Sequence, residues 1–169
     1  MGRQKRGKKE NMQHYYFDTS ILIGYINPKE GRDSSERAKN IIRASLKAIK
    51  RNSQIKIIIP TVVLGEIIQQ LNEILENSEW MDALGKLLKF IKDCKTQIDF
   101  PSPGRSHYEL ALKILERDDR FESMDALIIA HPILDENSKK FYSFDSMFIS
   151  SKIISELKDE YNSKFEIES

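Results

Sequence analysis

The sequence has few of the features that mark secreted or membrane proteins. Its 169 residues include a single cysteine, Cys94, so the chain cannot form an intramolecular disulfide or a cysteine-based zinc site. No hydrophobic run approaches the length that crosses a bilayer. The stretch nearest to a signal sequence, residues 17–26, carries Asp18 inside it. These absences predict an intracellular, cytoplasmic protein that does not enter a membrane.

Glycine and proline are also scarce, and no repeat or proline-rich linker divides the chain after residue 13. Hydrophobic residues make up 40% of the sequence and charged residues 31%, which is the composition of a folded globular protein rather than a disordered one. A length of 169 residues is that of one ordinary domain. We therefore expect residues 14–169 to form a single domain.

The formal net charge of +1 is distributed unevenly along the chain. Residues 1–13 hold five basic residues and one acidic residue, so the rest of the chain carries a formal charge of −3. A short basic arm can bind nucleic-acid phosphates by releasing counterions, but a solvated, flexible terminus often has the same composition. We expect residues 1–13 to be a flexible basic arm, and the sequence leaves its binding of RNA open.

The spacing of apolar residues predicts alternating strands and helices. Runs of β-branched and aromatic residues predict strands at residues 14–18, 55–59, 97–100, 140–144 and 164–167. Apolar residues at three- and four-residue intervals predict helices at residues 20–26, 33–51, about 61–75, 79–94, about 108–115, from 123 onward, and 146–160. This alternation indicates an α/β fold, in which helices cover both faces of a parallel sheet.

The helix that carries Asp125 has two local signals. Ser123 is its predicted N-terminal cap. Pro132 should kink this helix or end it near His131, because proline lacks an N–H donor and clashes with the preceding turn.

Four acidic residues, Asp18, Glu66, Asp125 and Asp145, stand where predicted helices begin or just after. Singly, the aspartates can be helix caps and Glu66 a solvated residue beside an apolar stripe. Ligands of parallel sheets bind beyond the carboxyl ends of the strands, where all four acids would meet. Carboxylates brought that close repel one another unless a cation or protons neutralise them. We therefore predict a metal site, and its oxygen ligands favour Mg²⁺ or Mn²⁺ over zinc.

Other candidate ligands have weaker support. The three histidines, His14, His107 and His131, show no paired spacing of the kind that binds metals, so we expect them to be ordinary polar or packing residues. Three further acids precede Asp125, at Asp118, Asp119 and Glu122. They either join the metal cluster or solvate a loop, and we expect the loop.

The segments around the four acids resemble the PIN-domain nuclease family. The resemblance rests on Phe17-Asp18-Thr19-Ser20, Leu64-Gly65-Glu66, Met124-Asp125-Ala126-Leu127-Ile128-Ile129-Ala130 and Ser143-Phe144-Asp145, and it covers residues 14–167. It implies a three-layer sandwich with a central parallel sheet of four to five strands flanked by helices. It also implies that the four acids bind one or two metal ions and that Ser20 and Ser143 support them by hydrogen bonding. The expected activity is that of an endoribonuclease acting on single-stranded RNA, as in VapC-like toxins that pair with an antitoxin protein.

One position departs from many VapC-like relatives. They carry a further acid two residues after the last one, where this chain has Met147. The substitution favours a single metal ion, or weak binding of a second.

Other functions stay open at the level of sequence. A PIN-like module that binds RNA or a protein without cleaving would keep the same fold. A phosphatase of the haloacid dehalogenase type also begins with an aspartate after its first strand, but it expects an acid where Ser20 stands. The apolar faces of the helices between residues 33 and 94 fit a homodimer, an antitoxin-like clamp, or simply the core.

Overall fold

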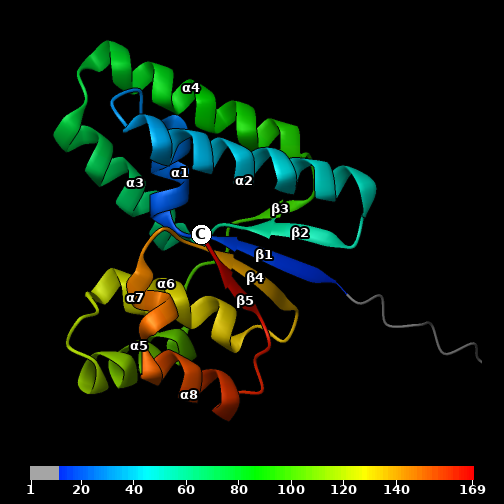
Figure 1. The fold of residues 1–169 in the computed structure, drawn as a ribbon, viewed down its shortest axis with the longest axis vertical. Coiled ribbons are helices and arrows are strands. Elements are labelled where there is room, and N and C mark those ends of the chain that lie inside the picture. The colour runs from blue at the N-terminus through cyan, green and yellow to red at the C-terminus, as the bar shows by residue number, and fades with distance from the viewer. Residues whose placement is uncertain (1–11) are drawn as a thin grey trace, which may run out of the picture.

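A computed structural model describes residues 12–169 of the chain (Figure 1). Its five strands are β1 (Gln13–Phe17), β2 (Ile55–Ile58), β3 (Ile98–Asp99), β4 (Ser138–Tyr142) and β5 (Glu166–Glu168). They form one sheet in the order β3-β2-β1-β4-β5, and every neighbouring pair is parallel. The predicted α/β fold is therefore confirmed.

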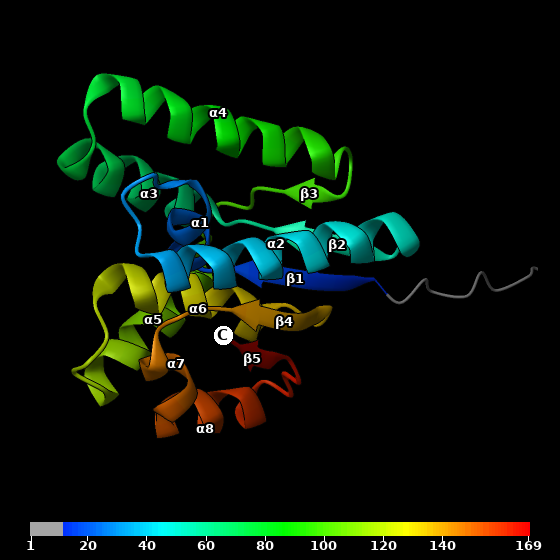
Figure 2. The same cartoon turned by 45° about the horizontal axis from the view of Figure 1, so that its top comes forward.

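Eight helices connect and cover the strands within the described residues. They are α1 (Thr19–Ile26), α2 (Arg32–Arg51), α3 (Thr61–Ile74), α4 (Asn77–Cys94), α5 (Arg105–Arg117), α6 (Ser123–Leu134), α7 (Ser146–Ser150) and α8 (Lys152–Glu160). Helices α2 and α4 lie on one side of the sheet, and α5, α6 and α8 lie on the other (Figures 1 and 2). The protein is thus a three-layer α/β sandwich.

Aromatic residues of the central strands fill both interfaces between the sheet and its helices. Phe17 of β1 packs against Phe90 of α4, with ring centroids 6.1 Å apart. Phe141 of β4 packs against Phe148 of α7 in the other layer, with centroids 5.1 Å apart. All four side chains are essentially inaccessible to solvent, and each such burial contributes roughly 1.5–3 kcal/mol to stability. The central strands are therefore anchored on both faces.

The predicted arm, residues 1–13, lies outside the described residues except for Met12 and Gln13. Gln13 already belongs to β1, because its N–H donates to the Gln54 carbonyl at 2.9 Å beside β2. Across the described residues, no helix has both the length and the hydrophobicity needed to span a bilayer.

Residues 146–160 form two helices, so the prediction of one continuous helix was wrong. Ser151 separates α7 from α8 in an extended conformation, and its hydroxyl accepts from the Ile154 N–H as the cap of α8. The same hydroxyl donates to Asp118 at 2.8 Å. A contact with a distant loop therefore holds the break in place.

Helix α6 also differs from its prediction. Its N-cap is Glu122 rather than Ser123, and the Glu122 N–H donates to Asp125 Oδ2 at 3.2 Å. The helix continues through Pro132 to Leu134 instead of ending near His131. Pro132 has no N–H to donate to the preceding turn, and its carbonyl accepts from the Ser163 hydroxyl at 3.2 Å.

Candidate active site

The four acids predicted to form a site line one hollow of about 320 Å³, here called the acid hollow. Asp18 is the N-cap of α1, Glu66 lies in α3, Asp125 in the first turn of α6, and Asp145 is the N-cap of α7. Asp18 and Asp145 follow the carboxyl ends of the neighbouring strands β1 and β4. The parallel sheet thus brings together four residues that are up to 127 positions apart in the sequence.

Asp18 is the most deeply placed of the four, with 5% of its surface exposed. Its Oδ2 accepts hydrogen bonds from the hydroxyls of Ser20 and Ser143, each at 2.7 Å. Burial raises the pKa of Asp18, while these hydroxyls and nearby backbone N–H groups oppose that increase. A buried carboxylate is therefore held in a single orientation at the floor of the hollow.

The same two serines connect Asp18 to the turn that carries Asp145. Ser20 Oγ accepts from the Phe144 N–H, and Ser143 Oγ accepts from the Asp145 N–H, both at 3.0 Å. Hydrogen bonds through Ser20 and through Ser143 therefore join the start of α1 to the start of α7.

Glu66 is fixed by two residues that the sequence analysis missed. Thr19 Oγ1 donates to Glu66 Oε2 at 2.5 Å, and Gln70 Nε2 donates to Oε1 at 3.1 Å. Gln70 stands four residues after Glu66 on the same helix, a spacing that indicates contact and could have been noticed. The sequence gives no comparable signal for Thr19, because its partner is 47 residues away.

Asp125 shows the electrostatic cost of the cluster. Burial raises its pKa to about 6, although the Glu122 N–H, which donates to Oδ2 at 3.2 Å, opposes this shift. The negative charges of the other three acids add to the increase. Bringing the four carboxylates together thus makes it harder to keep this one ionised.

Asp145 lies at the exposed edge of the hollow. Its Oδ1 accepts from the Met147 N–H at 2.7 Å. Met147, two residues after Asp145, is partly buried and packs against the hydrophobic core.

The acids suit a hard divalent cation in charge and in ligand type. A cation would relieve the repulsion at Asp125, and carboxylate oxygens are the ligands that Mg²⁺ and Mn²⁺ prefer. Within residues 12–169, however, no three acidic, histidine or cysteine side chains are grouped tightly enough to hold an ion. The carboxylates instead bind the hydroxyl, amide and backbone groups described above, so holding a metal requires some of them to turn toward the centre of the hollow.

Comparison with known families agrees with this arrangement. The model of the PIN-domain family matches residues 15–152, a span that includes all four acids. The chain belongs to the PIN-domain family. This membership removes the phosphatase alternative that the sequence had left open.

Two solved structures resemble the chain in fold. One is the VapC20 toxin of Mycobacterium tuberculosis, which cleaves the sarcin-ricin loop. It has a TM-score of 0.58 and 21% identity over 82% of this chain and 95% of that chain. The other is VapBC2 of Rickettsia felis, bound to a DNA fragment from the promoter of the VapBC2 proteins. It has a TM-score of 0.54 and 14% identity over 81% of this chain and 91% of that chain. No curated protein matches the sequence.

The additional acids before Asp125 do not line the acid hollow of this PIN domain. Asp118 binds Arg120 at 2.7 Å, and this contact holds the pKa of Asp118 well below its usual range. Glu122 caps α6, and Asp119 is exposed. The expectation that these residues belong to a loop is confirmed for Asp118 and Asp119, while Glu122 has a role at the helix start.

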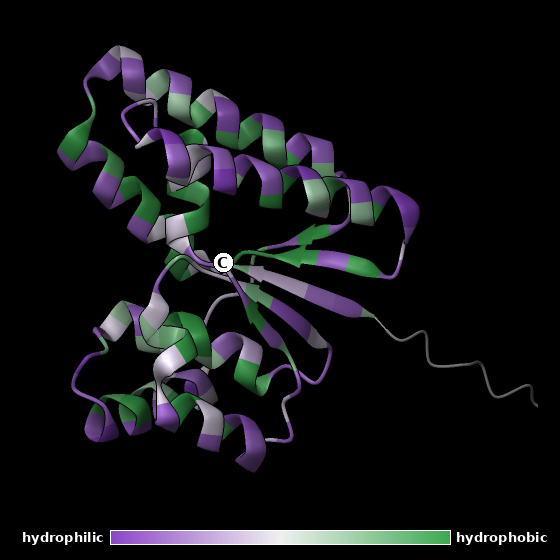
Figure 3. Cartoon of the chain, viewed as in Figure 1, coloured by the Kyte–Doolittle hydropathy of each residue, from purple (hydrophilic) through white to green (hydrophobic). Residues whose placement is uncertain are grey.

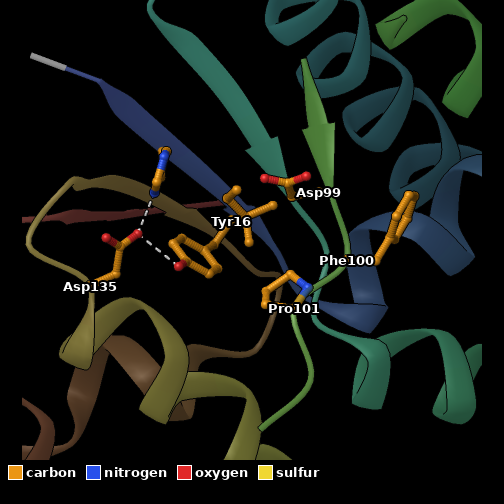
Figure 4. A pocket seen from close by; sticks show the side chains of 7 residues that line it. Tyr16, Asp99, Phe100, Pro101 and Asp135 are labelled. Carbon is orange, nitrogen blue, oxygen red and sulfur yellow. Dashed lines mark hydrogen bonds and ion pairs between the residues drawn. The ribbon is translucent and has the colours of Figure 1, made fainter. Parts of the chain in front are cut away.

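A larger hollow of about 390 Å³ lies beside β1, β2 and β3, and none of the four acids lines it (Figure 4). At its border, Asp135 Oδ2 accepts from the Tyr16 hydroxyl at 2.8 Å and contacts His14 Nδ1 at 2.6 Å. The other two histidines, His107 and His131, stack with ring centroids 4.1 Å apart. All three histidines therefore have polar or packing roles, as expected.

Proposed function

We propose that residues 14–169 form the nuclease domain of a metal-dependent endoribonuclease, which hydrolyses phosphodiester bonds in single-stranded RNA. The observation that carries this proposal is the meeting of four acids in one hollow of a PIN domain. A PIN-domain family match and a fold like that of an RNA-cleaving toxin support the choice of RNA.

Each acid has a distinct part in the proposed reaction. Asp18, Glu66 and Asp125 would hold an Mg²⁺ or Mn²⁺ ion, and Asp145 would hold a second ion or orient the attacking water. A bound metal supplies activation of that water and neutralises the charge that develops on the phosphate. The exposed position of Asp145 suits contact with water, while the hydrogen bonds to Asp18 and Glu66 fix their orientations. The presence of Met147 favours one tightly held ion over two.

We further propose that the protein is the toxin of a toxin–antitoxin pair. The fold similarity to VapC20 and VapBC2 supports this role. Large apolar residues exposed on α3 and α4, among them Ile68, Met81 and Leu88, offer a surface for an antitoxin or for a second copy of the chain. Light scattering of the purified protein, alone and with the product of a neighbouring gene, distinguishes the two.

Substitution of single carboxylates tests the nuclease proposal. Purified protein is incubated with labelled single-stranded RNA and Mn²⁺, and a parallel sample contains chelator. We expect Asp18→Asn and Asp125→Asn to fold normally and to cleave more than about 100-fold more slowly, because each loses a metal ligand. Asp159→Asn, an exposed acid on α8, is the matched control and should cleave at the normal rate. Normal cleavage by both site variants would rule out the proposed mechanism.

The second candidate is a PIN-like module that binds RNA or a protein without cutting it. The methionine at position 147 and the dispersed orientations of the four carboxylates favour it. RNA binding by the wild type without any cleavage in Mn²⁺ or Mg²⁺ would select this alternative.

A further inference from the structure

A groove between α2 and α4 combines positive charge with an apolar floor. It has a volume of about 260 Å³, and we call it the basic groove. Four cations line it, Lys39 and Arg43 from α2 and Lys86 and Lys89 from α4, above the apolar side chains of Ile42 and Leu46. The two helices lie on the opposite side of the sheet from α5, α6 and α8 (Figures 1 and 2).

Helix α2 extends the positive charge beyond the basic groove. Between residues 38 and 51 it carries five basic residues and no acid. Four of them share one face, at about 100° per residue: Lys39, Arg43, Lys47 and Lys50. Hydrophilic and hydrophobic residues alternate along α2 in Figure 3. Because residues 14–169 have a formal charge of −3, this concentration is a local feature and not a property of the whole domain.

Two acids lie near the groove and offset part of its charge. Glu36 pairs with Lys39 at 2.9 Å, and Asp93 is close enough to Tyr25 to raise the pKa of that phenol, with burial as the larger cause. Within residues 12–169, neither Arg43 nor Lys89 forms a salt bridge with an acidic side chain. These two cations remain free to bind an anionic ligand.

Tyr25 adds a partly exposed aromatic ring to the wall of the groove. Its ring is held edge-on against Phe90, with centroids 6.2 Å apart and an angle of 65° between the planes. A cationic groove with an aromatic ring is the combination by which proteins hold single-stranded nucleic acids, because phosphates bind the cations and bases stack on the ring.

We propose that the basic groove binds a segment of single-stranded RNA outside the acid hollow, with phosphates on Arg43 and Lys89 and a base on Tyr25. The choice of RNA as ligand rests on the proposed nuclease function. An acidic protein segment would also be attracted to the cations, but the held aromatic ring favours a strand with exposed bases.

Helix α1 places the two sites within reach of one strand. Ile23 lines the acid hollow, and Tyr25, two residues later, lines the basic groove. Tyr25 follows Asp18 by seven positions, which corresponds to a rise of about 10 Å along a helix. An RNA long enough to occupy both sites should therefore bind more tightly than one that fills only the acid hollow.

Binding is tested in an Asp18→Asn background, which prevents cleavage. The double variant Arg43→Gln/Lys89→Gln should bind a long single-stranded RNA at least about 10-fold more weakly by fluorescence anisotropy. The slope of log affinity against log salt should also decrease in magnitude by about 1.4, since two phosphate contacts are lost. The matched control, Lys139→Gln/Lys152→Gln, removes two exposed cations from β4 and α8 and should leave both quantities unchanged.

The aromatic contribution is tested separately. Tyr25→Leu should weaken binding at least about fivefold, whereas Tyr25→Phe should restore it, because stacking needs the ring and not the hydroxyl. Circular dichroism confirms that each variant is folded.

Cleavage distinguishes failure of this proposal from failure of the nuclease function. In the active protein, the Arg43→Gln/Lys89→Gln variant should have a higher KM for long RNA and an unchanged KM for a short oligonucleotide. Equal RNA affinity and equal KM in variant and wild type overturn the basic groove as an RNA site. RNA binding that depends on Arg43 and Lys89 in a protein that never cleaves would retain the groove and reject the nuclease. Loss of a protein partner with normal RNA binding would make the groove a protein-docking surface and refute the proposal.

Discussion

Thr19 links two of the four acids. It follows Asp18 directly, is 4% exposed, and donates to Glu66 across 47 residues of sequence. A single buried hydroxyl thus sets the orientation of a carboxylate on another helix.

We expect Thr19→Val to raise the Mn²⁺ concentration for half-maximal cleavage by about 10- to 100-fold, because Glu66 loses the donor that orients it. The substitution keeps the shape of the side chain, and Thr19→Ser should restore metal affinity. Thr61→Val, which removes a hydroxyl bonded to Ser102 at the surface, serves as the control. An unchanged Mn²⁺ dependence would show that Thr19 does not position Glu66.

His131 makes stability depend on pH. It is 2% exposed, and burial lowers its pKa to about 4, with a smaller contribution from neighbouring His107 and opposition from Asp135. The unfolded state therefore binds more protons than the folded state between about pH 6.5 and pH 4. Stability should fall as the pH decreases through this window, by about 2–3 kcal/mol between pH 7.5 and 4.5.

Urea unfolding at the two pH values measures this loss, and His131→Leu is the reference. The variant lacks the titrating group, so the loss on acidification should be about 2–3 kcal/mol smaller than in the wild type. If both proteins lose the same stability, His131 does not account for the acid sensitivity.

At the scale of residues, the acids could be placed from the sequence but most of their hydrogen bonds could not. Asp18 and Asp145 follow strands, and the geometry of parallel sheets brings strand ends together. The bond from Thr19 to Glu66 depends on how α3 is placed against α1 and on the rotamers of both side chains. The spacing of residues in the sequence predicts neither this placement of α3 nor these rotamers.

Close packing between α1 and α2 depends on Gly24. A Cβ at this position would lie 3.1 Å from Ala38 Cβ and 3.3 Å from a ring atom of Phe144. Gly85 on α4 is different, because a Cβ there would have no other atom within 4 Å. The two glycines therefore respond oppositely to larger side chains.

We expect Gly24→Val to destabilise the protein by about 1–3 kcal/mol through overpacking. Gly85→Ala should stabilise it by about 0.5–1 kcal/mol, because alanine loses less conformational freedom in a helix. Thermal and urea unfolding measure both. A Gly24→Val variant as stable as the wild type would show that α1 and α2 can move apart to accommodate the larger side chain at little cost in free energy.

At the scale of elements, periodicity located the helices better than it located their ends. The apolar spacing of residues 146–160 is continuous, yet Ser151 interrupts the helix because it caps α8 and binds the distant Asp118. Pro132 had the opposite outcome, because α6 continues through it to Leu134 although proline has no N–H to donate. Both differences come from context beyond the local sequence.

For the molecule as a whole, the acid cluster should lower stability when no metal is bound. The folded-state pKa of Asp125, about 6, is above the ordinary aspartate value of 3.8. The folded state then binds more protons than the unfolded state between these values, so this contribution to stability is present below about pH 4 and is lost as the pH rises through 6. At pH 7.5 the full cost is present.

Metal-free Asp125→Asn should therefore be more stable than the wild type at pH 7.5, by about 1–2 kcal/mol after allowance for solvent screening. Mn²⁺ at 100 times its Kd should stabilise the wild type by about 2.7 kcal/mol and have little effect on the variant. Thermal unfolding with Mn²⁺ and with chelator measures both effects. Equal stabilisation of the two proteins would place the metal elsewhere.

The layer architecture could be predicted because strands and helices alternate along the whole chain. The strand order β3-β2-β1-β4-β5 was not predicted, since it depends on which hydrophobic faces meet in three dimensions. The basic groove was missed for the same reason. Its cations come from two helices, and the groove forms only where these helices lie side by side.

The central position of β1 determines when the acid hollow becomes complete during synthesis. β1 leaves the ribosome before the other four strands but pairs with β4, and Asp18 receives a hydrogen bond from Ser143, 125 residues later. A nascent chain that has not yet emerged to that point lacks both Ser143 and Asp145. Translation therefore withholds the full acid set until four of the five strands have been made, so the proposed site can assemble only late in synthesis.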